Sequence, residues 1–296
     1  MTLQFVPNYV EIAVEPATWA RAREAEGWYG LAAADHLWDR GRAYPHVWVA
    51  LGAMAAATSR VMLTSSFANN LVRSPVEFAQ AAMTAQQASG GRFEAGLGAG
   101  WARAEIEQIG HRYPPPAERI SRYIEAIKIA GELLRTRHCS FHGEYYGVDV
   151  DILGPDVTPP PLVASLGGPR SIRMVSPLVD RVELKVSSSA TRGGELDYAA
   201  FQLVDEDHLD SLVAQVRAVR PDVPLGMFLQ VGVGDNPRLR QLSVTLGGSW
   251  MSRFIGPPAQ VAEALLALES HGIDRVQLTP YVPETFELLA PHLGGS

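Results

Sequence analysis

The chain has 296 residues, of which 25 are lysine or arginine, 32 are aspartate or glutamate and one is cysteine. This length suits two domains of ~150 residues or a single α/β barrel, and it excludes a marginal mini-domain. The formal net charge of −7 argues against a nucleic-acid binder, which would carry a basic face. The single cysteine, Cys139, excludes an intramolecular disulfide and a multi-cysteine metal centre. We therefore expect a protein whose partner is a small-molecule substrate.

Residues 1–7 lack the basic region and the apolar stretch that make up a signal peptide. The longest apolar runs, such as residues 48–57, are too short to cross a bilayer. We expect a cytoplasmic protein without a membrane partner.

Short apolar runs of β-forming residues alternate with longer helical patterns in the first hundred residues. Pro16 stands at a helix start, where its missing N–H costs nothing. The predicted strands cover residues 3–12, 29–34, 61–66 and 93–97, and the predicted helices cover 16–26, 45–59 and 75–88.

The pattern changes after residue 100. A short helix is expected over 105–110, and a longer one over 118–137, where apolar residues recur at helical spacing. Residues 138–161 mix strand and turn signals and are too many for an ordinary loop. We interpret residues 105–160 as an insertion that covers the mouth of a barrel.

Alternation resumes in the second half of the chain. The predicted strands cover residues 162–166, 181–186, 224–233 and 275–279, and the predicted helices cover 170–176, 205–219, 257–270 and 284–292. Eight strand–helix units predict a (β/α)₈ TIM barrel formed by one domain over residues 1–296. The alternative is an open, doubly wound sheet.

Active sites of such barrels lie at the C-terminal ends of the strands. Asp35 and His36 follow the second strand, where an imidazole beside a carboxylate can hold or move a proton. The structural alternative is a histidine that caps the next segment. Residues 96–100 are rich in glycine and allow close approach of a ligand, although their spacing differs from the dinucleotide fingerprint.

Gly167, Gly168 and Arg170 follow the fifth strand. Backbone N–H groups at a helix start and a guanidinium can bind an anion, although an ordinary turn would look the same. The remaining histidines have no metal-ligand spacing, and Cys139 fits a small apolar role. We predict no metal site.

The run 91–101, followed by Glu105 and 115–119, strongly resembles the bacterial luciferase-like flavin and deazaflavin oxidoreductases. The similarity is greatest to members that use the deazaflavin coenzyme F420. Supporting segments follow the family's order along nearly the whole chain: 35–36, 70–75, 142–146, 167–170 and 272–276.

The resemblance implies where a deazaflavin would bind. Asp35 and His36 match the pair near its reactive face, and Ser66-Phe67 matches the place of a non-prolyl cis peptide behind the ring. Gly167 and Gly168 match backbone donors to the cofactor phosphate. The same resemblance implies further cofactor contacts at Ser65, Gly98, Gly100, Trp101 and Arg170.

Two positions depart from the family pattern. Trp101 stands where some members carry a glutamate that acts as the acid, so Glu105 is the nearest candidate for a catalytic carboxylate. Residues 181–185 replace a Gly-Trp or Gly-Phe pair that many members carry after the preceding aspartate.

The resemblance implies hydride transfer between coenzyme F420 and a small metabolite, for example in reduction of a C=C or C=N bond. His36 is the expected proton donor or acceptor, and Asp35 would orient it or contact the cofactor. The alternatives are a monooxygenase that uses reduced FMN, and a barrel that has lost catalysis and acts as a binding partner. Family resemblance also implies a homodimer. The alanine-rich helices at 47–57 and 76–88 offer a surface for it, and the alternative is that these helices pack on the barrel.

Overall fold

A computed structural model describes residues 3–10, 13–39 and 42–294. Eight parallel strands pair side by side, and the pairing of β7 with β10 closes them into a barrel. In barrel order the strands are β1 (Gln4–Tyr9), β2 (Gly30–Ala33), β5 (Met62–Ser65), β7 (Phe93–Gly98), β10 (Leu162–Leu166), β11 (Arg181–Leu184), β12 (Leu225–Val233) and β14 (Arg275–Pro280). The closure confirms the predicted (β/α)₈ barrel and excludes the open sheet.

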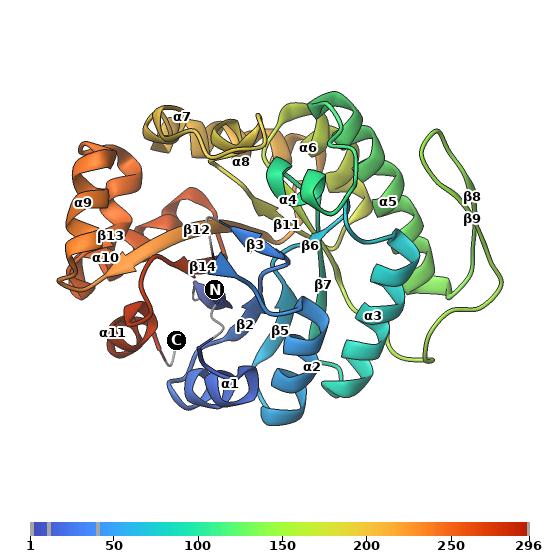
Figure 1. The fold of residues 1–296 in the computed structure, drawn as a ribbon, viewed down its shortest axis with the longest axis horizontal. Coiled ribbons are helices and arrows are strands. Elements are labelled where there is room, and N and C mark those ends of the chain that lie inside the picture. Colours follow the sequence, from blue (N-terminus) through green and yellow to red (C-terminus); the bar gives the residue numbers. More distant parts are fainter. Residues whose placement is uncertain (1–2, 11–12, 40–41, 295–296) are drawn as a thin grey trace.

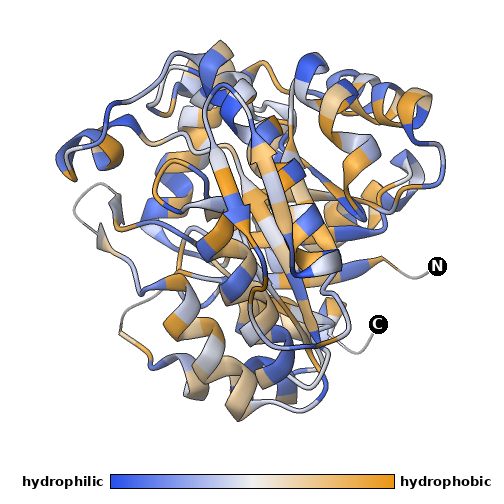
Figure 2. Ribbon diagram, turned by 90° about the vertical axis from the view of Figure 1, so that its right-hand side faces the viewer, coloured by the Kyte–Doolittle hydropathy of each residue, from blue (hydrophilic) through white to orange (hydrophobic). Residues whose placement is uncertain are grey.

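Helices surround the strands, as Figure 1 shows. They are α1 (Pro16–Ala25), α2 (Val47–Ala57), α3 (Pro75–Ala88), α5 (Pro116–Thr136), α6 (Pro169–Val175), α8 (Glu206–Val219), α10 (Pro258–Leu266) and α11 (Thr285–Leu293). Local signals set their starts. Ser74 accepts the N–H of Glu77, and Pro75 occupies the first turn of α3. Hydrophobic and hydrophilic residues alternate along the outer helices in Figure 2, as expected for helices with one buried face.

The segment 105–160 is divided between three places. A short helix, α4 (Arg103–Gln108), lies near the mouth, whereas α5 packs between α3 and α6 as a member of the outer ring. The strands β8 (Cys139–His142) and β9 (Gly147–Val150) form an antiparallel hairpin outside the ring (Figure 1). Only the first part of the expected insertion therefore lies at the mouth.

The carboxylate of Glu125 on α5 holds the tip of this hairpin. It accepts the backbone N–H groups of Glu144, Tyr145 and Tyr146 at 2.8, 2.9 and 3.1 Å.

No elements are predicted over residues 187–204 and 234–256, and the structure adds several short ones. These are the strands β3 (Trp38–Asp39), β4 (Arg42–Ala43), β6 (Ala68–Asn69) and β13 (Ile255–Gly256), the helices α7 (Tyr198–Gln202) and α9 (Pro237–Leu246), and the 3₁₀ turns η1 (Ser176–Leu178), η2 (Ser189–Thr191) and η3 (Trp250–Phe254). The predicted helix over 257–270 is observed as α10 followed by the 3₁₀ turn η4 (Ala267–His271).

Charged side chains occupy the interior of the barrel. Arg275 on β14 donates two hydrogen bonds to Glu94 on β7, at 2.6 and 3.0 Å. The carboxylate of Glu183 on β11 is fully buried, and its oxygens have no hydrogen-bond partner in the described part of the chain. Its nearest cation is the Arg275 guanidinium, at 3.8 Å. Burial raises the pKa of Glu183 to about 7, against the opposing effect of Arg275.

Among the described residues, we find no helix with both the length and the apolar character of a membrane span.

Candidate active site

The ends of β5 and β7 form one wall of the barrel mouth. The Ser66–Phe67 peptide bond that follows β5 is cis, as the family resemblance implied. Ser65 donates a hydrogen bond from its hydroxyl to the backbone oxygen of Gly96, at 2.7 Å. A Cβ atom at Gly98 would lie only 3.0 Å from the Cβ of Phe67, so a larger residue here would require Phe67 to shift. The two strand ends are therefore packed tightly behind the mouth.

Asp35 lies at the end of β2 and is almost completely buried. Its carboxylate accepts two hydrogen bonds from the Arg73 guanidinium, at 2.9 and 3.2 Å, and one from the backbone N–H of Asn69, at 2.8 Å. The expectation that Asp35 orients His36 is therefore corrected. Both carboxylate oxygens are occupied by the loop after β6, and this pairing ties that loop to β2.

Glu105 takes the role that was expected of Asp35. Its Oε2 lies 3.0 Å from Nδ1 of His36, and its Oε1 accepts the backbone N–H of Leu37. The Glu105 side chain is 2% exposed, whereas the His36 side chain is 20% exposed. A buried carboxylate thus fixes the orientation of an imidazole that still reaches the solvent-accessible mouth.

The short helix α4 carries Glu105 to this place. The backbone N–H of Arg103 donates to the carbonyl of Gly194 at 2.9 Å, and the neighbouring Ile106 is fully buried. After the helix, the Tyr113 hydroxyl donates to the carbonyl of Trp101 at 2.8 Å. These contacts hold the segment that follows β7 and Gly100 against the mouth.

Aromatic rings surround the imidazole. The Trp101 ring lies edge-on to His36 with a centroid distance of 5.7 Å, and the Tyr44 ring lies 5.4 Å away on a tilted plane. The Lys185 ammonium, which follows β11, lies 5.1 Å from the Trp101 ring centroid. Burial, together with the nearby Arg119 guanidinium, lowers the pKa of Lys185 to about 8.

Lys185 is a candidate site residue that the sequence analysis missed. The segment 181–185 was read only as a departure from the family pattern. Arg181 lies at the opposite end of β11, where it pairs with Asp274, and Glu183 lies inside the barrel. A usable signal was present, because Lys185 directly follows a barrel strand on its C-terminal side.

Gly167 and Gly168 lie between β10 and α6. A Cβ atom at Gly167 would lie 2.4 Å from the Cβ of Ser188, so this turn is in close contact with the segment after β11. Arg170 donates from its guanidinium to the carbonyl of Ala117 at 3.0 Å and to the hydroxyl of Ser121 at 2.8 Å. Its side chain therefore links α6 to α5, and a role in binding an anion stays a prediction.

Within the described ranges, no three histidine, cysteine, aspartate or glutamate side chains are grouped so that they could hold a metal ion. Cys139 is buried, and burial raises the pKa of its thiol to about 11, which keeps it protonated.

Comparison with known proteins gives the family of the chain. A family model described as luciferase-like monooxygenase matches residues 13–187. The F420-dependent glucose-6-phosphate dehydrogenase of Nakamurella multipartita is 33% identical over 172 residues, which cover 56% of this chain and 50% of that protein. The chain thus spans about half the length of this relative.

Solved structures share the fold at lower sequence identity. An F420-dependent secondary alcohol dehydrogenase, solved with an F420-acetone adduct, superposes with a TM-score of 0.75 at 18% identity over 99% of both chains. The monooxygenase RslO1 from Streptomyces bottropensis gives a TM-score of 0.76 at 17% identity over 98% of both chains. The family model covers more than half of the chain and includes the His36–Glu105 pair. The chain therefore belongs to the luciferase-like monooxygenase family.

Proposed function

We propose that this protein is an oxidoreductase that uses the deazaflavin coenzyme F420 to transfer a hydride to or from a small organic substrate. The observation that carries the proposal is the pairing of His36 with the buried Glu105 at the barrel mouth. The partial match to an F420-dependent dehydrogenase supports the choice of cofactor.

The His36–Glu105 pair is arranged for proton transfer. An ionised Glu105 only accepts hydrogen bonds, so Nδ1 of His36 carries the proton between them. Nε2, which is bonded to the other side of Cε1 from Nδ1, has no hydrogen-bond partner among the described residues. In neutral His36 this nitrogen accepts a proton, and in protonated His36 it donates one to a substrate heteroatom or carbon. Glu105 holds the ring in the same orientation for transfer in either direction.

The mouth offers groups that fit a planar, polar-edged cofactor. The Ser66 hydroxyl lies beside the cis peptide, is buried, and has no hydrogen-bond partner in the described part of the chain. A bound cofactor would supply the missing partner. Ser65, Phe67, Gly98, Gly100 and Trp101 would line the ring, and the backbone of Gly167 and Gly168 would face the cofactor phosphate. When bound, a deazaflavin supplies the hydride donor or acceptor.

The proposed kind of substrate follows from the proton transfers that His36 can make. Removal of a proton from a hydroxyl accompanies oxidation of an alcohol, and the relative from Nakamurella multipartita is named for a hydroxyl-bearing sugar phosphate. The reverse transfer, from protonated His36, serves the reduction of a C=C or C=N bond that the sequence suggested. Lys185 adds a cation at the mouth that would favour a substrate with a negatively charged group.

Two substitutions test the assignment of the pair. We expect His36→Ala to lower kcat by about 10²–10⁴-fold, because a positioned acid or base contributes that much. Glu105→Gln keeps the shape of the side chain but removes its charge, and we expect at least a tenfold lower kcat. The control is His292→Ala, at an exposed position on α11. Full activity of His36→Ala would contradict the proton-transfer role, and binding of F420 by each variant reports whether the site is intact.

A monooxygenase reaction with reduced FMN is the second candidate, because the matching family model bears that name. It predicts oxygen consumption with reduced FMN and no turnover with F420.

We also propose a homodimer that forms through α2 and α3. One face of α2 is buried on the barrel, whereas Val49 on its other face is 70% exposed and Gly52 has open space beside it. Small residues on an exposed apolar face allow two helices to approach closely. Location in the cytoplasm stays a prediction.

A further inference from the structure

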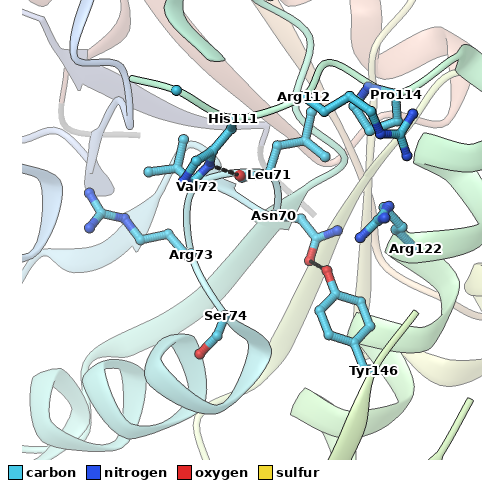
Figure 3. A pocket seen from close by; sticks show the side chains of 11 residues that line it. Asn70, Leu71, Val72, Arg73, Ser74, His111, Arg112, Pro114, Arg122 and Tyr146 are labelled. Atoms are coloured by element: carbon cyan, nitrogen blue, oxygen red, sulfur yellow. Dashed lines mark hydrogen bonds between the residues drawn. The ribbon is translucent and has the colours of Figure 1, made fainter. Parts of the chain in front are cut away.

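A cavity of about 490 Å³ lies beside the barrel mouth. It is lined by the loop after β6, the connection between α4 and α5, Arg122 on α5, and the tip of the β8–β9 hairpin. Neither His36 nor Glu105 lines it. Its lining includes the side chains of Asn70, Arg73, Arg112, Arg122 and Tyr146 (Figure 3).

Asn70 supplies an unused hydrogen-bond donor in this cavity. The side chain is 4% exposed, and its Oδ1 accepts a hydrogen bond from the Tyr146 hydroxyl at 3.2 Å. Its Nδ2 has no partner in the part of the chain that the structure describes. In Figure 3 this nitrogen faces the space next to the guanidinium groups of Arg112 and Arg122. Leaving a buried amide donor unpaired is unfavourable, and a bound acceptor would remove that penalty.

The charges around this donor favour an anion. Arg112 and Arg122 share a single carboxylate oxygen of Glu118, which Arg122 Nε reaches at 2.9 Å. Among these three side chains, two guanidinium groups against one carboxylate leave a surplus of one positive charge. The nearby Glu125 carboxylate is bonded to three backbone N–H groups of the hairpin tip. The cavity lining itself contains no acidic residue. Each guanidinium uses one N–H group on Glu118, and a guanidinium has five.

The third cation of the lining is already neutralised. Arg73 is bonded to Asp35 through both carboxylate oxygens, so its charge is committed to the tether between β2 and the loop after β6. The positive charge available to a ligand therefore comes from Arg112 and Arg122.

We infer that this cavity is a binding site for an anionic group, a phosphate or a carboxylate, held by Asn70 Nδ2 and the guanidinium groups of Arg112 and Arg122. Such a group accepts hydrogen bonds and donates none, which matches a lining of donors. The site is separate from the His36–Glu105 pair and does not depend on the proposed reaction.

Calorimetric titration of the full chain with inorganic phosphate, and separately with glutarate, tests the site. We expect saturable binding at millimolar concentrations of at least one of the two anions. Arg112→Met and Arg122→Met should each raise the Kd about tenfold, since each removes a charge-assisted hydrogen bond. Asn70→Asp, which keeps the size of the side chain and adds a negative charge, should abolish binding. Arg238→Met, at an exposed position on α9, is the matched control and should leave the Kd unchanged.

Thermal unfolding of each variant shows whether it is folded. The Arg112→Met variant, at an exposed position, and the Arg122→Met variant, at a half-buried one, keep the test valid if Asn70→Asp does not fold. Binding that survives all three cavity substitutions, or no saturable binding of either anion, would overturn the inference. A titration in the presence of F420 identifies the source of the anion. Displacement of phosphate by F420 assigns the site to the cofactor, and simultaneous binding assigns it to a separate ligand.

Discussion

His36 gains its proposed chemistry from a residue that lies 69 positions later in the chain. The sequence places Asp35 next to it, yet Asp35 is bonded to Arg73, and the imidazole is held by Glu105. Adjacent residues at a strand end point in different directions, because side chains alternate along an extended backbone. Partners of strand-end residues are therefore set by the loops that fold over the mouth.

The lowered pKa of Lys185 gives a second prediction about a single residue. Its pKa is lowered to about 8, because burial disfavours the ammonium. The chain has only two lysines, Lys128 and Lys185. After reductive ¹³C-methylation, we expect one dimethyl-lysine resonance to titrate with a midpoint near pH 8, and this signal should be absent from Lys185→Arg. Lys128→Arg is the control and should retain it. A midpoint above pH 10 for both lysines would contradict the placement of Lys185.

The tether between Asp35 and Arg73 gives a prediction at the scale of elements, since it joins the end of β2 to the loop that leads into α3. Both side chains are largely buried. Arg73→Met would leave the Asp35 carboxylate buried without its cation, and we expect a loss of about 3 kcal/mol in the free energy of unfolding. Arg21→Met on the exposed face of α1 should change it by no more than about 0.5 kcal/mol. Chemical denaturation measures both, and equal effects of the two substitutions would show that the tether does not contribute.

Elements with strong local signals were predicted well from the sequence. The helix over 75–88 and the strand over 162–166 have the predicted bounds, because Ser74, Pro75 and the flanking prolines and glycines mark their ends. The role of α5 was not predictable in the same way. Its apolar stripe shows that it packs on something, but only the closed barrel decides that it fills the place between α3 and α6. Short elements such as β3, β6 and β13 were missed, because two-residue strands are defined by their partners.

At the scale of the whole molecule, the barrel holds an interior carboxylate that opposes stability at neutral pH. The pKa of Glu183 is about 7 in the fold and near 4.5 in an unfolded chain. The folded state therefore binds the extra proton between these values, and the stability due to Glu183 is lost as pH rises from about 4.5 through 7. The cost is of the order of 3 kcal/mol.

Glu183→Gln removes this titration. We expect the variant to gain stability relative to the native chain as pH rises from 5 to 8, and urea unfolding at several pH values measures the difference. A constant difference between the two proteins across this range would contradict the raised pKa of the buried Glu183 carboxylate.

The exposed apolar face of α2 predicts that the whole molecule forms a dimer. We expect a dimer by light scattering, and a monomer for Val49→Asp, because the charge would be buried in the helix contact. Val244→Asp on α9 is the control, since Val244 is 75% exposed on a different face. A native chain that is monomeric at all concentrations would contradict the proposed dimer.

The proposed function requires that the barrel mouth binds a deazaflavin and that the His36–Glu105 pair serves hydride transfer at it. Titration of the purified protein with oxidised and reduced F420, followed by absorbance, measures this binding. We predict a saturable spectral change at tens of micromolar F420, retained in Glu105→Gln. No change with either form of F420, together with oxygen consumption in the presence of reduced FMN, would contradict it.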